Sequence, residues 1–198
     1  HNPDLNYDLG DNRYIKRLAF DELLAERLAL TLVKNKIIKS SQKDKLENDS
    51  RKLKNYFIEN KLSFALTSDQ LNVIREIESD TFSTKVMQRL LQGDVGSGKT
   101  IVAFLSMLNY IENKKQCVLM VPTSILAMQH FDYISKICEN ENVVVEVLTG
   151  KIKGKKRENI LERLKNGEID ILVGTHALLE ENVEFKNLGY VVIDEQHR

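Results

Sequence analysis

Cysteine, proline and glycine are scarce in this 198-residue chain, which has 2, 2 and 9 of them, and tryptophan is absent. Two cysteines are too few for a disulfide framework or a cysteine-based zinc site. So little proline and glycine excludes a collagen-like chain, and no apolar run approaches the roughly 18 residues that span a bilayer. Because no signal peptide opens the sequence either, we expect a cytoplasmic protein with reduced thiols.

Neither sign of charge dominates the chain. Lysine and arginine together number 29, as do aspartate and glutamate, so the formal net charge is zero. This balance excludes a histone-like protein that binds through bulk charge, although a local basic patch would be enough to bind nucleic acid. The length fits one domain with a helical appendage. We expect a piece of a longer protein, because the chain starts at His1 and stops at Arg198, just after an acidic cluster.

The first third of the chain differs in pattern from the rest. From Arg13 to about Lys34, apolar residues recur at helical spacing with charges between them, which predicts a long amphipathic helix. Residues 36–66 have a weaker helical pattern, and no strand pattern lies nearby. We therefore expect residues 1–66 to be a helical segment distinct from residues 67–198.

From Thr67 onward, short apolar runs alternate with helix patterns. Thr67 itself can cap a helix that runs to about Ser79. The unbroken, β-branched runs are typical of strands that are buried on both faces. Strands are predicted at residues 87–92, 117–121, 143–148, 169–173 and 190–193, and helices between them at 99–113, 124–138 and 154–166. This alternation predicts an α/β fold, a parallel sheet with helices on both faces that binds ligands at the carboxyl ends of its strands.

One predicted strand ends in a glycine-rich segment that precedes a predicted helix, with the sequence Gly93-Asp94-Val95-Gly96-Ser97-Gly98-Lys99-Thr100. The segment matches the phosphate-binding pattern G-x-x-x-x-G-K-[ST]. Its glycines let the backbone approach a polyphosphate, and its amides and the helix N-terminus point at the anion. Lys99 can reach the β- and γ-phosphates, and Thr100 can offer its hydroxyl to Mg²⁺. A chance match in a glycine-containing turn is the weaker interpretation.

An acid pair follows the last predicted strand. The apolar run at residues 190–193 leads directly into Asp194 and Glu195. Asp194 can hold Mg²⁺, often through water, because this ion keeps much of its hydration shell. Glu195 can orient and deprotonate an attacking water. The alternative is an ordinary solvated turn at a strand end, but the glycine-rich segment upstream favours a nucleotide site.

Several segments resemble the motifs of superfamily 2 helicases, and of the RecG-type ATP-dependent DNA helicases in particular. Motif II is matched by Asp194-Glu195-Gln196-His197, and motif I by residues 89–100. The Q-motif, motif Ia, two further motifs and the helical linker of that family are matched by residues 64–70, 121–130, 148–150, 174–179 and 20–24. The resemblance covers nearly all of residues 13–198 in order.

The resemblance implies a RecA-like P-loop fold that binds ATP and Mg²⁺. Residues 67–198 would be the first motor domain, incomplete at its C-terminus, and residues 1–66 a helical linker from a wedge domain. The implied activity is that of an ATP-dependent DNA helicase or translocase, which remodels branched DNA and stalled forks in recombination and repair. Its partners would be branched or forked DNA, the second RecA-like domain and the wedge domain. Because the arginine fingers would come from the second motor domain, we expect the fragment alone to be weakly active or inactive.

The resemblance also assigns roles to single residues. Gln70 would read the adenine edge, and contact with DNA would fall to Thr123, His130, Thr175 and His176. Coupling between the nucleotide and DNA sites would fall to Gln196 and His197. From the residues alone, Thr123 can also cap a helix, and the two roles are compatible. Phe64 could stack on the base, but a core aromatic is the better explanation of this residue. Five basic residues within 151–157 indicate either an anionic partner or a solvated run.

Other functions stay open at this point. The transcription-repair coupling translocase has a similar first motor domain, but it carries Asp-Glu-Glu-His where this chain has Gln196. A nucleotide-binding module that never hydrolyses ATP is a second alternative, against which Glu195 argues. A pure interaction domain that docks through the long helix at residues 13–34 is a third, although packing on the motor explains that helix as well.

Overall fold

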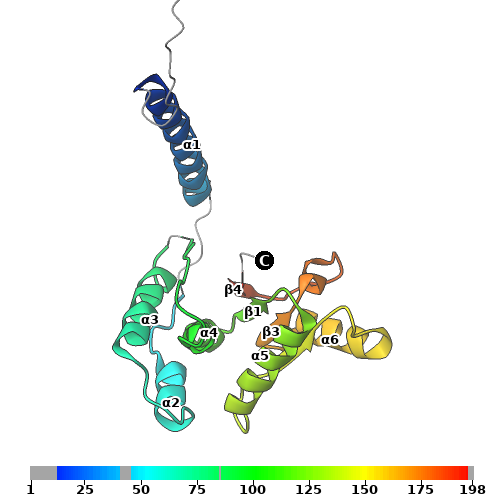
Figure 1. The fold of residues 1–198 in the computed structure, drawn as a ribbon. Helices are drawn as coiled ribbons and strands as arrows, with labels where there is room; N and C mark the ends of the chain where they lie inside the picture. The colour runs from blue at the N-terminus through cyan, green and yellow to red at the C-terminus, as the bar shows by residue number, and fades with distance from the viewer. Residues whose placement is uncertain (1–12, 41–45, 85, 196–198) are drawn as a thin grey trace, which may run out of the picture. The chain divides into compact units, whose positions relative to one another are not determined.

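The computed structural model describes residues 13–40, 46–84 and 86–195. The chain forms two compact units, one made of His1–Asp44 with Thr84–Val86 and the other of Lys45–Ser83 with Met87–Arg198. Figure 1 shows the chain coloured from blue at the N-terminus to red at the C-terminus. All the candidate site residues belong to the second unit.

A helix forms most of the described part of the first unit, which also includes Thr84 and Val86. This helix, α1 (Arg13–Ser40), confirms the helix expected from the spacing of the apolar residues, although it ends later than Lys34. Leu18 and Leu23 on this helix are exposed. Among the described residues, no helix combines the length and the hydropathy that crossing a bilayer would need.

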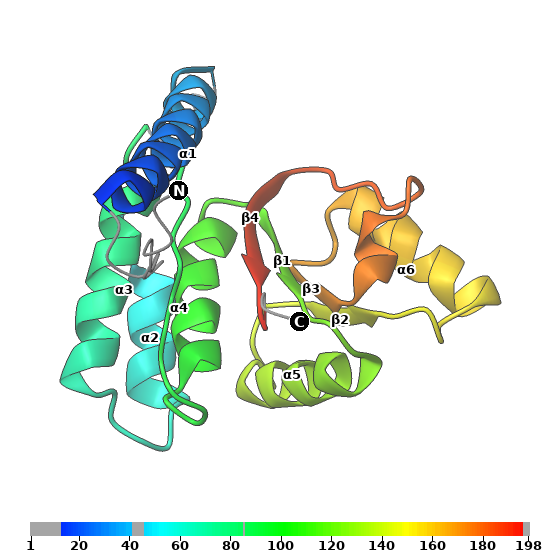
Figure 2. The same ribbon diagram turned by 45° about the horizontal axis from the view of Figure 1, so that its top comes forward.

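Parallel strands form the sheet of the second unit, in the spatial order β2, β3, β1, β4 (Figure 2). All three pairings are parallel, as expected when helices connect the strands. Four of the five predicted strands are confirmed, with their ends shifted by a residue or two. Their bounds are β1 (Gln116–Met120), β2 (Val145–Leu148), β3 (Ile171–Gly174) and β4 (Leu188–Ile193).

The helices of the second unit also follow the predicted pattern. Three of them begin at the predicted residues: α4 (Lys99–Glu112), which precedes β1, and α5 (Ser124–Ile137) and α6 (Gly154–Asn166), which lie between strands. Most of α4 is buried, because its apolar residues lie on nearly all sides of the helix. Earlier in the chain lie α2 (Lys52–Asn60) and α3 (Ser68–Thr81), and a short 3₁₀ helix, η1 (His176–Leu179), follows β3.

Alternate residues of the sheet face two separate hydrophobic cores. Cys117 and Leu119 of β1 lie in the larger core with residues of α4 and α5. Val118, between them, lies in the smaller core with Ile160 and Leu164 of α6. Since neighbouring side chains of a strand point to opposite faces, the sheet is covered by helices on both faces, which confirms the predicted architecture.

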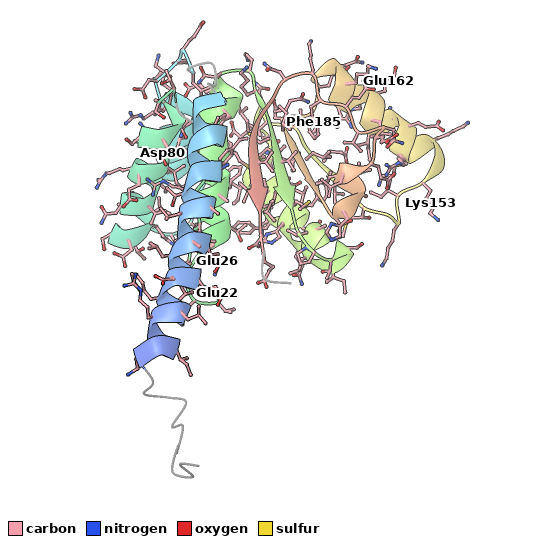
Figure 3. All side chains as sticks on the ribbon, turned by 90° about the horizontal axis from the view of Figure 1, so that it is seen from above. Glu22, Glu26, Asp80, Lys153, Glu162 and Phe185 are labelled. Atoms are coloured by element: carbon pink, nitrogen blue, oxygen red, sulfur yellow. The ribbon has the colours of Figure 1, made fainter. Side chains whose placement is uncertain are left out.

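The predicted strand at residues 87–92 is wrong. In the described residues between α3 and α4 no strand is present, and β4 forms the edge of the sheet. Arg89 holds this segment against α3 instead, because its guanidinium pairs with Glu76 at 2.7 Å and with Asp80, labelled in Figure 3, at 2.5 Å. A short apolar run looks alike in a strand and in such a segment, so its periodicity could not separate the two.

Thr67 caps α3 as predicted. Its hydroxyl accepts a hydrogen bond from the Gln70 amide at 3.2 Å, and the Gln70 side-chain oxygen accepts from the Thr67 amide at 2.9 Å. This reciprocal pair is a capping box. Replacing Thr67 with alanine should lower the free energy of unfolding by about 1 kcal/mol. Urea unfolding of Thr67→Ala beside Thr67→Ser, which keeps the hydroxyl, measures this, and equal stability of the two variants would contradict it.

Both cysteines are buried, which confirms that they are core residues. Burial raises the pKa of the Cys117 thiol well above its usual value, and that of Cys138 to about 12. Since the thiolate is the reactive form, both thiols are poor nucleophiles in the folded chain. Within the described ranges, no group of three or more histidine, cysteine, aspartate or glutamate residues could hold a metal ion.

Candidate nucleotide-binding site

The carboxyl ends of the strands are aligned along one edge of the sheet. Met120, the last residue of β1, pairs in register with Gly174 of β3 and Ile193 of β4. Backbone hydrogen bonds continue one residue further, because the Val121 amide donates to the Gly174 carbonyl at 2.9 Å and the Asp194 amide to the Met120 carbonyl at 2.9 Å. The acid pair and the segments that follow β1 and β3 therefore leave the sheet side by side.

The glycine-rich loop precedes α4, as predicted, but it does not follow a strand. Gly96 and Gly98 have φ angles of 81° and 82°, in the left-handed region that favours glycine. The Ser97 amide donates to the Asp94 carbonyl at 3.1 Å and closes a turn. The loop is exposed, and a Cβ atom added at Gly96 would meet nothing within 4 Å. The loop therefore has room for a ligand beside its backbone.

The side chain of Lys99 folds back onto this loop. Its ammonium donates to the carbonyls of Gly93 at 2.8 Å and Asp94 at 2.9 Å. Neutral carbonyls are weaker partners for a cation than phosphate oxygens are, because hydrogen bonds between two ions are the stronger kind. Thr100 follows in the first turn of α4, where the helix N-terminus favours an anion. The glycine-rich loop, the Lys99 ammonium and the N-terminus of α4 thus lie together, and this arrangement suits a polyphosphate.

Helix α4 connects the loop to the sheet. The helix packs on β1 and β4, where Tyr110 stacks on Tyr190 with 4.6 Å between ring centroids. A tight turn at residues 113–115 joins the end of α4 to the start of β1, which runs back along the helix (Figure 2). The N-terminal end of α4, with its glycine-rich loop, is therefore directed toward the edge of the sheet that carries the acid pair.

Gln70 is tied to the glycine-rich loop. Its side-chain nitrogen donates to the Ser97 carbonyl at 2.9 Å, while its oxygen serves the capping box of α3. A Cβ atom added at Gly98 would come within 2.4 Å of the same nitrogen, so only glycine fits there without movement. The carboxamide thus positions the loop from α3. Its contact with adenine stays a prediction.

Hydrogen bonds to both oxygens fix the Asp194 carboxylate. Oδ1 accepts from the Glu195 amide at 2.9 Å, and Oδ2 lies 3.1 Å from Nε2 of His130 on α5. Glu195 has φ of 55°, a left-handed conformation that non-glycine residues seldom adopt and that occurs often at functional sites. The sequence did not predict the contact between His130 and Asp194, which are separated by 64 positions.

Three of the residues expected to contact DNA lie near the same edge. Thr123 caps α5, since its hydroxyl accepts a hydrogen bond from the Leu126 amide at 3.3 Å. The helix-cap role predicted for Thr123 is therefore confirmed. Thr175 and His176 follow β3 at the start of η1, and His176 is exposed. Capping uses only an acceptor position of Thr123, so its hydroxyl can still donate to a phosphate oxygen. Contact with DNA stays a prediction for all three.

Two further expectations concern the coupling residues and Phe64. Gln196 and His197 lie outside the described residues, so the structure does not test their coupling role. Phe64 is 47% exposed, and the prediction of a core aromatic is therefore wrong. Phe64 lies at a bend between α2 and α3, not on the buried face of a helix.

The basic run at residues 151–157 lies mostly in solvent. Its lysines are exposed, and Figure 3 shows Lys153 pointing away from the sheet. Arg157 differs, because its guanidinium donates to Glu180 at 2.8 Å and to Asn182 at 3.2 Å. One of the five basic side chains is therefore structural, and the other four form an exposed positive surface at the start of α6.

Comparison with known proteins gives the family. The sequence profile described as DEAD/DEAH box helicase matches residues 67–198. The ATP-dependent DNA helicases RecG of Aquifex aeolicus and Bacillus subtilis are 46% and 44% identical to the chain over 185 and 192 residues. These alignments cover 93% and 95% of this chain but 23% and 28% of the two proteins. The chain thus spans about a quarter of the length of these curated relatives.

Solved structures support the same conclusion. A structure of RecG bound to a three-way DNA junction matches with a TM-score of 0.84 at 44% identity, over 92% of this chain and 25% of that one. The UvsW helicase from bacteriophage T4 is 17% identical with a TM-score of 0.54, over 77% of this chain and 53% of that one, and shares the fold. The RecA-like fold is thereby confirmed. The chain belongs to the DEAD/DEAH box helicase family and resembles its RecG-type members.

Proposed function

We propose that the chain is the nucleotide-binding part of an ATP-dependent DNA helicase of the RecG type. Residues 67–198 act as the first RecA-like motor domain, and residues 1–66 as a helical linker from a wedge domain. The high identity to RecG over more than nine-tenths of the chain supports this assignment over a transcription-repair coupling translocase. The complete protein then uses ATP hydrolysis in the cytoplasm to move on DNA and to remodel branched DNA and stalled forks.

The observation that carries the proposal is the glycine-rich loop at the start of α4 with the Lys99 ammonium on its carbonyls. On binding ATP, the ammonium exchanges these carbonyls for β- and γ-phosphate oxygens. The loop amides and the N-terminus of α4 bind the remaining phosphate charge. Gln70, which already holds the loop at Ser97, keeps the loop in position.

The acid pair fits a magnesium site beside the phosphates. Each oxygen of an ionised carboxylate has two acceptor positions, and each oxygen of Asp194 uses one of them within the chain. The free positions suit Mg²⁺ or its waters, and the Thr100 hydroxyl would be the second protein ligand. Mg²⁺ neutralises charge on the phosphates when bound. Glu195 then orients the attacking water and accepts its proton.

The residues that we expect to contact DNA lie near the same edge of the sheet. Thr123, Thr175 and His176 lie near it and can reach a backbone phosphate through hydroxyl or ring donors. RecG itself has been solved on a three-way DNA junction. We therefore assign branched or forked DNA as the partner of the complete protein, with Gln196 and His197 coupling the two sites.

Nucleotide binding with a lysine control tests the proposal. Lys99→Ala should weaken binding of a fluorescent ATP analogue about 10- to 100-fold, because the loss of a hydrogen bond between two ions costs about 1.5–3 kcal/mol. Lys136→Ala, an exposed lysine on α5, removes the same charge elsewhere and should leave the affinity unchanged. Equal affinities for the Lys99→Ala variant and the unmodified chain would overturn the proposed function.

The isolated chain should bind nucleotide weakly and hydrolyse it poorly, because the second motor domain would supply the arginine fingers. Such residues contribute about 10³–10⁵ in rate at related sites. Phosphate release with and without forked DNA measures this. DNA-stimulated turnover of the isolated chain, at the rate of an intact RecG assayed beside it, would contradict the assignment.

A further inference from the structure

The contact between His130 and Asp194 joins two segments that the nucleotide chemistry does not otherwise connect. His130 lies on α5, about two turns after the Thr123 cap, whereas Asp194 follows β4. Its Nε2 atom lies 3.1 Å from Oδ2, and the two side chains are only 14% and 27% exposed. Little of the imidazole is therefore available for DNA, which was the role expected for it.

The chemistry of the pair fixes the direction of the hydrogen bond. An ionised carboxylate can only accept hydrogen bonds. The Nε2 atom of His130 must therefore carry a hydrogen and donate a hydrogen bond to Oδ2. The amide of Glu195 occupies the other oxygen at 2.9 Å. Two donors from different directions set the rotation of the carboxylate. The acceptor positions left over then point in a defined direction before any ion arrives.

We propose that His130 is a positioning residue for the magnesium-binding carboxylate of Asp194. The inference rests on the proposed function, since it requires Asp194 to serve as the magnesium ligand. The histidine does not touch the nucleotide or the ion. It holds one oxygen of the ligand and leaves the other acceptor positions aimed outward, the arrangement by which neighbouring hydrogen bonds tune metal affinity elsewhere in proteins.

An alanine variant and a conservative variant separate this role from a purely structural one. His130→Ala removes the donor and leaves the carboxylate free to rotate. His130→Gln keeps a donor nitrogen at a similar distance from the backbone, so it should restore most of the effect. Lys136→Ala, on the exposed side of the same helix, is the matched control. Thermal unfolding of each variant reports any loss of stability.

The measurement is the affinity of the full 198-residue chain for a fluorescent ATP analogue, in excess Mg²⁺ and in EDTA. The ratio of the two affinities is the gain that Mg²⁺ provides. We expect His130→Ala to reduce this ratio about 10- to 100-fold, the usual effect of removing a hydrogen bond to a metal ligand, with an unchanged affinity in EDTA. His130→Gln should recover most of the ratio, and Lys136→Ala all of it.

The possible results separate a failure of the proposed nucleotide-binding function from a failure of the role of His130. If the unmodified chain and Lys99→Ala bind the analogue equally, the proposed function fails and the inference fails with it. If the unmodified chain gains affinity from Mg²⁺ and His130→Ala keeps the same gain, only the role of His130 is wrong. Equal losses of affinity in Mg²⁺ and in EDTA would assign His130 a structural role and would also overturn the inference.

Discussion

Glu195→Gln should lower the rate of ATP hydrolysis by about 10²- to 10⁴-fold and leave binding of the magnesium nucleotide almost unchanged. Glutamine has nearly the shape of glutamate and can still hold a water through its oxygen, but it cannot accept the proton of that water. General-base catalysis by a positioned carboxylate contributes a factor of this size. The loss should appear in the chemical step, because the phosphate-binding loop and Asp194 are not altered.

Single-turnover hydrolysis by the complete helicase, with enzyme in excess over labelled ATP, measures this step, because the second motor domain then supplies the arginine fingers that the isolated chain lacks. Glu181→Gln changes an exposed glutamate after η1 in the same way and should hydrolyse ATP at the unmodified rate. If Glu195→Gln also turns over at the unmodified rate, Glu195 is not the base. A nucleotide-binding module without hydrolysis would then be the better interpretation of the acid pair.

Glu78→Ala should destabilise the fold by about 3–5 kcal/mol, a large part of the roughly 5–15 kcal/mol that holds a typical domain together. Glu78 on α3 is buried and pairs with the buried ammonium of Lys54 on α2. Asn109 of α4 donates at 3.4 Å to the same oxygen, Oε1, that Lys54 contacts, and Arg51 lies 3.7 Å from Oε2. Removing the carboxylate leaves a buried cation without its counterion, which is the costly way to break such a pair.

Urea unfolding of three variants measures the effect. Glu76→Ala, also on α3, removes a carboxylate that is 62% exposed and pairs with Arg89, so it should cost no more than about 1 kcal/mol. Lys54→Met combined with Glu78→Leu replaces the pair by apolar side chains and should recover most of the lost stability. A loss of less than about 1 kcal/mol in Glu78→Ala would show that the cluster does not hold α2, α3 and α4 together.

Local patterns in the sequence predicted most of the fold. The helices that became α4, α5 and α6 could be placed from the spacing of their apolar residues, and the Thr67 cap from its side chain. The segment at residues 87–92 could not be placed, because its structure depends on the pairing of Arg89 with two acids of α3. That pairing is a tertiary contact, which a short apolar run does not encode.

In the candidate site, too, some features could be predicted from local sequence and others depend on tertiary contacts. The loop at residues 93–100 has a pattern that carries its own chemistry, so the sequence alone could identify it. The bonds from Gln70 to Ser97 and from His130 to Asp194 span 27 and 64 positions. Such contacts depend on how α3 and α5 pack beside the sheet, and no local pattern reveals them. The two positioning contacts of the site are therefore the part that only the structure shows.

A crystal structure of the chain with Mg²⁺ and a non-hydrolysable ATP analogue is the most direct test of a site shared by the loop and the acid pair. A shared site requires the Lys99 ammonium on the β- and γ-phosphates, with Thr100 and Asp194 bound to the same Mg²⁺ directly or through water. An analogue held by the loop, with neither Asp194 nor Glu195 contacting the nucleotide, its Mg²⁺ or their waters, would contradict it.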